Sequence, residues 1–171
     1  MAGPETELIN PTTRPFTTFR FLVEIKVDKI SDKVCGGTFS EVDGLEMTME
    51  PKTIREGGNN TSPVHFVGPV TYGQLTLKRG MTHNFDLWKW FARVTSPGFR
   101  GVRARAEIVM VSSDGRSEDA RFVADGCLPV KLKAPSLNAK EGQIAIEEMQ
   151  IVYQTLTLRG DNRQGGGAAQ A

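Results

Sequence analysis

The side chains that most often carry chemistry are few and scattered in this chain. It has two histidines, His65 and His83, and two cysteines, Cys35 and Cys127. A metal site or an acid–base pair needs a second group that converges on the first. Neither histidine has a histidine four residues away, and the cysteines share no close spacing motif. The sequence therefore predicts no metal site and two reduced, partly buried thiols.

Three further patterns lack what a reaction centre requires. Glu147 and Glu148 are adjacent, but neighbouring residues of a strand point to opposite faces and cannot act together as acid and base. The stretch from Arg55 to Asn60 has two glycines, yet no Walker pattern and no helix N-terminus follow it. No Ser-His-Asp or Cys-His set can be proposed from the spacings. We therefore expect no catalytic, cofactor-binding or metal-binding residues, no cofactor, and a protein that is not an enzyme.

Composition limits the function further. The chain has 171 residues, 39% of them hydrophobic, and its 21 basic and 20 acidic residues leave a formal net charge of +1. A near-neutral chain has no overall field that would attract nucleic acid. The N-terminus lacks the basic and apolar regions of a signal peptide, and no apolar run approaches the roughly 18 residues of a membrane helix. We expect synthesis in the cytoplasm without a signal peptide and no membrane insertion by this chain.

The elements that must position these residues are mainly strands. Apolar residues alternate with a period of two through most of the chain, which is typical of half-buried sheets. In the first strand the expected inner face is Phe19, Phe21, Val23, Ile25 and Val27. The expected strands are residues 16–27, 34–42, 45–50, 64–70, 73–79, 102–112, 120–133 and 144–158.

Two local features of these strands can be predicted. Asp43-Gly44 lies between two strand-like runs and predicts a tight hairpin there. In the last strand, Ile144 and Ile146 have one parity and Met149 and Ile151 the other. A bulge near Glu147-Glu148 would bring both sets to one face.

Residues 84–95 form the one convincing helical pattern. Thr82 or Asn84 could cap the helix, and Ser96-Pro97-Gly98 would end it. A wide apolar stripe of this kind normally packs on a sheet. The expected stripe consists of Phe85, Leu87, Trp88, Phe91 and Ala92.

The apolar alternation stops after Met49, but the chain continues through PKTIREGGNNTSP, residues 51–63. This indicates a long polar hairpin arm beyond the core. Such an arm contributes little to a monomer, and usually reaches a partner or is mobile.

Four segments of the chain together form a pattern that belongs to a known family. They are FSEVDGLEMTMEPKTIREGGNN, YGQLTLKRGM, LWKW and VKLKAPSLNAKEGQIAIEEMQI. The most specific part is the Glu-Gly-Gly-Asn stretch followed by Leu-Lys-Arg-Gly. In these segments the chain resembles the tail tube proteins of contractile-tailed phages and related contractile injection systems, and the order and spacing agree from about Phe16 to Leu158.

The resemblance implies a mainly β fold: two packed antiparallel sheets or a β-barrel, one flanking α-helix and a long protruding β-hairpin arm. It implies a domain over residues 16–159, with a flexible lead over 1–15 and a flexible tail over 160–171. It also implies hexameric rings stacked into the hollow inner tube of a phage tail or injection particle. The implied partners are other copies of the chain, a sheath protein that drives the tube through a target envelope, baseplate or adaptor proteins, a terminator, and DNA or protein cargo in the lumen.

Two groups of site residues follow from this resemblance. The polar face of the first strand would line the lumen, with Arg20, Glu24 and Lys26 as members. The alternatives to an inner tube subunit are a tube initiator or baseplate adaptor of the same machine, and a small-ligand-binding β-barrel. Contacts between subunits or rings are expected from the arm residues Glu50, Lys52, Arg55, Glu56, Asn59 and Asn60.

Overall fold

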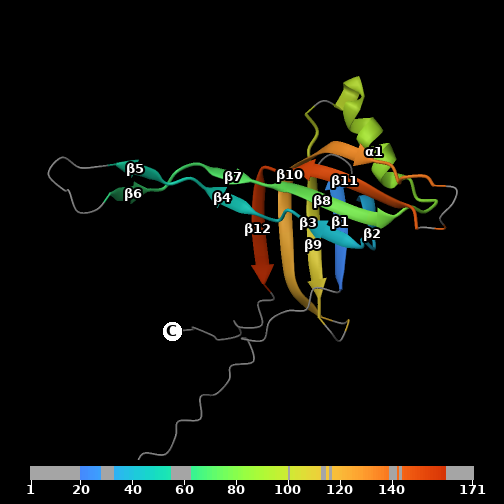
Figure 1. The fold of residues 1–171 in the computed structure, drawn as a ribbon, viewed down its shortest axis with the longest axis horizontal. Coiled ribbons are helices and arrows are strands. Elements are labelled where there is room, and N and C mark those ends of the chain that lie inside the picture. Colours follow the sequence, from blue (N-terminus) through green and yellow to red (C-terminus); the bar gives the residue numbers. More distant parts are fainter. Residues whose placement is uncertain are drawn as a thin grey trace, which may run out of the picture.

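The computed structural model of this chain describes residues 20–27, 33–54, 63–99, 101–112, 115, 117–138, 142 and 144–160. Figure 1 shows a body of crossing strands with a helix at one side and an arm that projects away from it. The strands are β1 (Phe21–Val27), β2 (Lys33–Gly37), β3 (Glu41–Asp43), β4 (Met47–Met49), β5 (Lys52–Ile54), β6 (Val64–Phe66), β7 (Val70–Tyr72), β8 (Gln74–Gly80), β9 (Ala104–Val111), β10 (Glu118–Lys133), β11 (Ile146–Val152) and β12 (Thr155–Gly160). The helix α1 is Asp86–Thr95, and a short 3-10 helix, η2, is Pro97–Phe99.

The body is one antiparallel sheet folded into two packed layers. Its strand order is β2-β1-β9-β10-β11-β8-β3, and β12 also pairs with β10. The first part of β10 pairs with β9 and β12, whereas Leu128–Lys133 pairs with β11. The mainly β fold with packed antiparallel sheets, one helix and an arm is confirmed. Within the described residues the sheet runs from β2 to β3 without joining its ends, so it is not a closed barrel.

The fold between the two layers is made at one corner of the molecule. The register of β10 against β9 shifts between Ala124 and Cys127, and Gly126 has a φ of +70°. Glycine adopts this left-handed conformation without the steric penalty of a side chain. Beside it, β11 gives way to β12, and the Gln154 N–H donates to the Asp125 carbonyl at 2.8 Å. Strands β10 and β11–β12 therefore turn together from one layer into the other.

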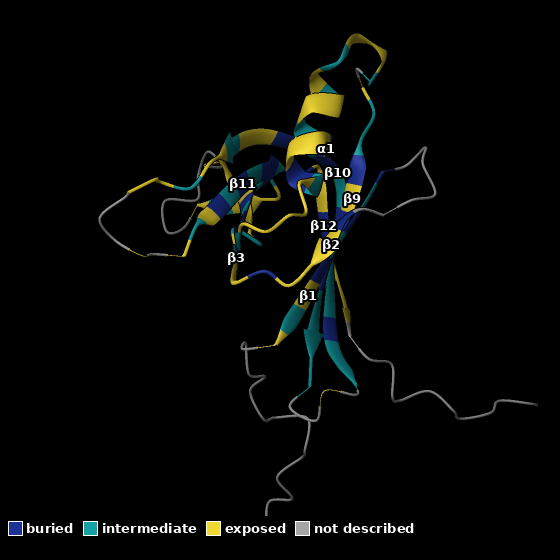
Figure 2. Cartoon of the chain, turned by 90° about the vertical axis from the view of Figure 1, so that its right-hand side faces the viewer, coloured by how far each residue is buried: buried dark blue, intermediate teal, exposed yellow. Residues whose placement is uncertain are grey.

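The core lies between the layers and under α1. Val23, Ile25 and Val27 of β1 are buried, while Glu24 and Lys26 lie on the opposite face. This confirms the face predicted for the described part of the first strand; Phe19 lies outside the described residues. Figure 2 shows the buried positions alternating along the strands that meet in the middle of the body. Cys35 and Cys127 are both buried and neither is in a disulfide.

The predicted hairpin at Asp43-Gly44 is wrong. The expected strand 34–42 is divided into β2 and β3, and β3 pairs with β8 rather than with β4. Gly44 has a φ of +86°, and a Cβ there would lie 1.9 Å from the Gln74 carbonyl oxygen. The glycine thus marks a kink at which two long strands approach closely, and the chain continues outward into the arm.

The predicted bulge near Glu147-Glu148 is also wrong. Strand β11 pairs with β8 in unbroken register from Ile146 opposite Gly80 to Val152 opposite Gln74. The break falls later, between β11 and β12. Because the register is regular, Met149 and Ile151 face the core together with Glu147, whereas Ile144 and Ile146 are exposed.

The helix is confirmed, but its predicted stripe is partly wrong. It buries Leu87 and Trp90 and contacts β2 and β10, with Phe91 and Val94 packed against the core. These four positions follow the i, i+3, i+4, i+7 spacing of one helix face. The remaining predicted members of the stripe, Phe85, Trp88 and Ala92, are exposed.

The predicted end of the helix is confirmed, but neither predicted cap is its N-cap. The N-cap is Phe85, which makes no side-chain cap hydrogen bond. The Asn84 Oδ1 accepts a hydrogen bond from the N–H of Asp86, the first helical residue, at 3.2 Å, and the Thr82 Oγ1 accepts one from the Asn84 N–H at 3.2 Å. The helix stops before Ser96, as predicted.

Candidate assembly surfaces

The arm is a long hairpin that continues the β3–β8 pair beyond the body. It consists of two short ladders, β4 with β7 and β5 with β6. Between the two ladders the two strands of the arm cross closely at Gly68, where a Cβ would lie 1.6 Å from the Glu50 carbonyl oxygen. The Glu50 N–H donates to the Pro69 carbonyl at 3.4 Å. Only glycine permits this close approach of the two strands.

Each ladder of the arm has a mainly apolar side and a polar side, and in the outer ladder the mainly apolar side also carries Lys52, opposite Phe66. Met47 and Met49 lie opposite Tyr72 and Val70, and Ile54 lies opposite Val64. Thr48, Thr71, Thr53 and His65 occupy the alternate positions, with a 3.1 Å hydrogen bond between Thr53 and His65. Of the polar stretch predicted for residues 51–63, only 51–54 and 63 are described, and the strands on either side of it carry exposed apolar side chains. Their exposed large apolar side chains are Met47 (61%), Met49 (47%), Ile54 (53%), Phe66 (50%) and Val70 (46%), with Val67 (80%) in the crossing.

The root of the arm is fixed to the body by Tyr153. Its buried hydroxyl accepts a hydrogen bond from the Glu46 N–H at 3.1 Å and lies 2.8 Å from the Gly44 carbonyl oxygen. Burial raises the pKa of this phenol, so it stays protonated and able to donate. The Tyr153 and Tyr72 rings are 5.7 Å apart. The arm therefore leaves the body in a direction set by buried contacts.

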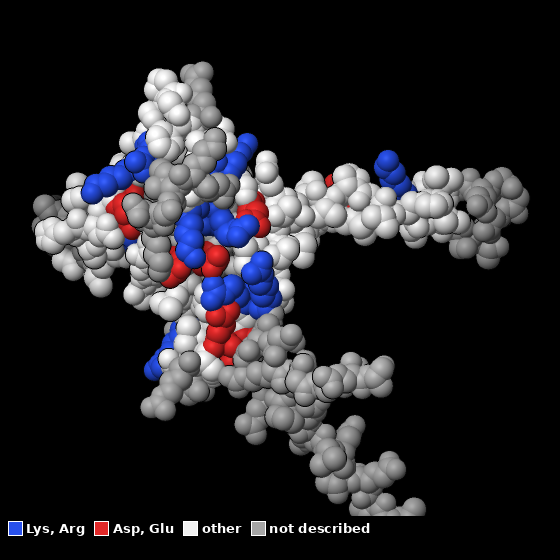
Figure 3. Space-filling model, turned by 180° about the vertical axis from the view of Figure 1, so that it is seen from behind, with Lys and Arg blue, Asp and Glu red and all other residues white. Residues whose placement is uncertain are grey.

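The outer face of β1, β9 and β10 carries charges of both signs, which we call the mixed-charge face. Lys26 Nζ lies 3.4 Å from Glu24 and 3.8 Å from Glu107. Arg121 pairs with Glu107 and, at 2.7 Å, with Glu118. Figure 3 shows basic and acidic side chains interleaved on the body, in contrast to the arm, where few are seen. The face consists of Glu24, Lys26, Arg105, Glu107, Glu118, Arg121 and Asp125.

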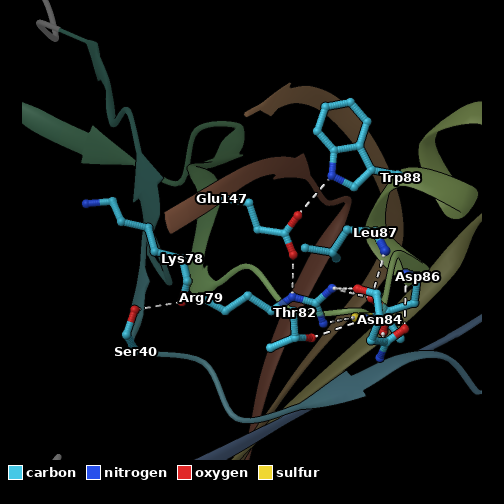
Figure 4. A network of polar contacts seen from close by, with 10 residues as sticks. Ser40, Lys78, Arg79, Thr82, Asn84, Asp86, Leu87, Trp88 and Glu147 are labelled. Carbon is cyan, nitrogen blue, oxygen red and sulfur yellow. Dashed lines mark hydrogen bonds and ion pairs between the residues drawn. The ribbon is translucent and has the colours of Figure 1, made fainter. Parts of the chain in front are cut away.

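A buried ionic cluster joins the neighbouring strands β8 and β11 to the helix (Figure 4). Arg79 of β8 and Glu147 of β11 lie directly opposite one another, only 5% and 0% exposed. The Arg79 Nε donates to Glu147 at 2.7 Å, and its Nη2 pairs with Asp86 at the start of α1. The second Glu147 oxygen accepts from the Trp88 Nε1–H at 2.9 Å. Both carboxylate oxygens and the guanidinium are therefore satisfied.

The surroundings of this cluster hold it in the charged state. Burial disfavours the Arg79 cation, but hydrogen bonds to Asp86 and Glu147 outweigh burial and raise its pKa above the ordinary value. Burial also disfavours the Asp86 anion, but the hydrogen bond from Arg79 lowers its pKa below 3.8. Burial, aided by nearby Asp86, raises the pKa of the Cys35 thiol. The thiol thus stays neutral, and the cluster acts as a fixed connection rather than as a nucleophile.

Comparison with known proteins identifies the family. The family model for the T4-like virus tail tube protein gp19 matches residues 17–157. The chain belongs to this family. It is a tube-type protein of phage tails or contractile injection systems. No curated protein sequence matches it.

Solved structures agree with this family membership. A chain of the anti-feeding prophage baseplate superposes with a TM-score of 0.75 and 26% identity, covering 86% of this chain and 97% of that one. A chain of an extracellular contractile injection system in its extended sheath–tube complex gives a TM-score of 0.73 and 19% identity, covering 88% and 95%. A chain of the anti-feeding prophage tube-terminating cap gives 0.72 and 19%, covering 86% and 93%. The family and these relatives are structural components of tails and tubes.

The structure describes some of the residues predicted for the tail tube surfaces and places them in two different regions. Glu50 and Lys52 are exposed on the arm, whereas Arg55, Glu56, Asn59 and Asn60 lie outside the described residues. Arg20 is exposed at the start of β1, and Glu24 and Lys26 belong to the mixed-charge face. In the part of the chain that the structure describes, no cluster of three metal-ligating side chains occurs, and no helix is long and apolar enough to cross a membrane.

Sequence reasoning missed both the buried cluster and the apolar sides of the arm. The period-two pattern of the sequence already indicated the two central residues of the buried cluster. Continuing Leu75 and Leu77 by two residues gives Arg79, and stepping back from Ile151 and Met149 gives Glu147. The assumed bulge concealed this parity.

Proposed function

We propose that this chain is the inner tube subunit of a contractile machine, forming hexameric rings that stack into a hollow tube for cargo. The observation that supports it most is the arm. Its strands have no core of their own and expose apolar side chains far from the body. Exposed apolar patches of several hundred Å² mark interaction sites, and an element of this kind is completed by neighbouring copies.

We propose that the mixed-charge face, which includes Glu24 and Lys26, lines the lumen together with Arg20 at the start of β1. Its charges pair with one another, so the surface is hydrated but presents little net charge of either sign. Such a surface limits the retention of charged cargo during passage, because no extended field of one sign attracts it.

The partners of the similar structures support corresponding partners for this chain. Those structures comprise a sheath–tube complex, a baseplate and a tube-terminating cap. We propose a sheath protein around the tube, and baseplate and terminator proteins at its ends. The baseplate relative favours a second candidate, a tube initiator or adaptor. Counting copies per isolated particle separates the two, because a tube subunit is among the most abundant proteins and an adaptor forms one or two rings.

Electron microscopy of the purified chain tests the proposal. The parent protein should form rings or tubes with six-fold symmetry. The test variant lacks most of the arm: Asn-Gly replaces residues 49–70 and joins Thr48 to Thr71, which are directly opposite one another. An Asn-Gly turn suits such a connection. We expect this variant to remain folded but monomeric.

The exposed loop residue Leu137 provides a matched control, since it lies outside the arm and is 91% exposed. The L137S variant should assemble like the parent. A parent chain that stays monomeric at high concentration, or an arm-deleted chain that forms normal tubes, would contradict the proposed role.

A further inference from the structure

We propose that the outer arm ladder of one copy seats its apolar side in a groove on the body of a second copy. This rests on the proposed tube function and specifies the surface that receives the arm. The arm side chains concerned are Ile54, Phe66 and Val67. The groove is lined by Phe21, Val42, Leu45, Ile108, Met110 and Phe122.

The groove is an unfinished edge of the core. It has a volume of about 260 Å³ and lies where the inner faces of β1, β9 and β10 extend past β3. In Figure 2 the ends of these long strands extend beyond the crossing layer. All six lining side chains are apolar, and Phe21, Val42, Leu45 and Phe122 already pack against the core on their inner sides. A further apolar side chain placed there would continue the core outward.

The size of the groove suits the proposed occupant. An apolar cavity of about 150 Å³ is large enough for a benzene ring. The groove therefore has room for the Phe66 ring and part of a neighbouring aliphatic chain. Phe66 and Ile54 are each about half exposed, and Val67 is 80% exposed. Both surfaces lose contact with water when they meet, which is favourable by about 25 cal/mol per Å² of apolar area.

The area of the arm also fits a contact between copies. Its exposed apolar side chains together offer a surface on the order of several hundred Å², the scale of a functional patch. A stable interface buries about 800 Å² per partner. The arm thus supplies a large part of what one contact requires, and the polar sides of its ladders and strand edges can supply the remainder.

The arm cannot reach the groove of its own chain. Val42 and Leu45 of the groove belong to the segment that leads into the arm, and Tyr153 holds the adjoining Gly44 and Glu46. From this root the ladders run away from the body (Figure 1). Every copy therefore carries one arm and one groove that only different copies can join. Such a heterologous contact repeats from copy to copy and yields closed rings or extended stacks.

Charge substitutions on either side test this contact. In the arm variant, I54K and F66E remove the apolar side. These positions are diagonal neighbours across the ladder, and Phe66 lies opposite Lys52, so the new charges attract one another and preserve the ladder. In the groove variant, M110E places a charge among apolar side chains. A second groove variant, M110W, fills the space while keeping it apolar, and serves if M110E fails to fold.

Mass photometry of the full-length chains provides the measurement, with circular dichroism to confirm folding. The arm variant and each folded groove variant should be monomeric alone. Mixed one to one, they should form a complex, because the groove of the first and the arm of the second are intact. The L137E variant, changed at an exposed site outside both surfaces, should assemble like the parent.

The outcomes separate this inference from the proposed function. A parent chain that never assembles overturns both. If the arm variant fails to assemble while the folded groove variants form rings like the parent, the groove is not the receiving surface and the tube function stands. Monomeric variants that give no complex on mixing also overturn the arm–groove contact.

Discussion

The body and the arm place their side chains in opposite ways. The body encloses Arg79 and Glu147, a full ion pair, at its centre. The arm instead exposes Met47, Ile54 and Phe66, side chains that normally form a core. Each arrangement is unfavourable when isolated, because buried charges lose hydration and exposed apolar groups order water around them.

The difference lies in where the compensation is found. In the body every buried polar side-chain atom among the described residues has a hydrogen-bond partner within the chain. In the arm the apolar sides have no cover within the described part of the chain. The buried polar groups of the body are therefore satisfied within one chain, whereas the apolar sides of the arm are covered only in an assembly. Changes to the buried cluster should alter stability, and changes to the arm or to the groove that receives it should alter association.

The largest expected effect is on the buried cluster. The R79M substitution leaves Glu147 buried without its cation and separates Asp86 from its partner. Breaking a buried ion pair in this way typically destabilises a protein by about 3–5 kcal/mol. Urea denaturation of the parent and variant measures the loss. The matched control is R105M, because Arg105 pairs with Asp125 at the surface and exposed pairs contribute only about 0–1 kcal/mol.

One result would weaken the contrast between body and arm. Equal losses for R79M and R105M would mean that the buried cluster contributes no more than a surface pair. The R79M/E147L double variant sharpens the test, because it removes both charges of the central pair. It should be less destabilised than R79M alone, as expected for residues whose effects are coupled.

A smaller effect should appear in the acid dependence of stability. Asp86 has a lowered pKa in the folded protein, so its contribution is present above the unfolded value, near 3.8, and is lost as the pH falls through the lower folded value. Urea titrations between neutral and strongly acidic pH should show this loss in the parent. The D86N variant should lack that component. An unchanged acid slope in D86N would show that Asp86 and Arg79 are not coupled.

The sequence predicts the periodic parts of the fold well. The inner face of β1, the strand β8 and the end of α1 follow from alternation and from Ser96-Pro97-Gly98, because these are local properties of the chain. The buried cluster depends on a pairing across 68 residues, between Arg79 and Glu147. The choice between Trp88 and Trp90 as the core residue likewise depends on where the helix meets β2 and β10, which local spacing does not determine.

The candidate surfaces show the same limit. Alternation places Glu24 and Lys26 on the outer face, but the ion pair between Lys26 and Glu107 requires β1 and β9 to be neighbours. Asp43-Gly44 has the composition of a hairpin turn, yet the approach of Gln74 makes it a kink. Gly68 and its crossing with Glu50 are visible only once the two strands of the arm are paired.

The smallest expected change in stability belongs to the mixed-charge face. The E107Q substitution removes an acceptor from Lys26 and Arg121, but Arg121 keeps its pair with Glu118 at 2.7 Å. We expect a loss of about 1 kcal/mol or less, as for other partly exposed pairs. The consequence for assembled rings should be larger, since every copy loses one negative charge from the same surface.

Retention of a short single-stranded DNA by assembled rings tests this. The E107Q rings should retain it more strongly than the parent, and added salt should remove the difference, because binding through phosphates is salt dependent. The control E41Q makes the same change in net charge on β3, where Glu41 pairs with Lys78 in the other layer. Equal retention by E107Q and E41Q would show that the mixed-charge face does not line the lumen. Greater retention by E107Q alone would mean that the balanced ion pairs of this face keep the passage free of adhering cargo.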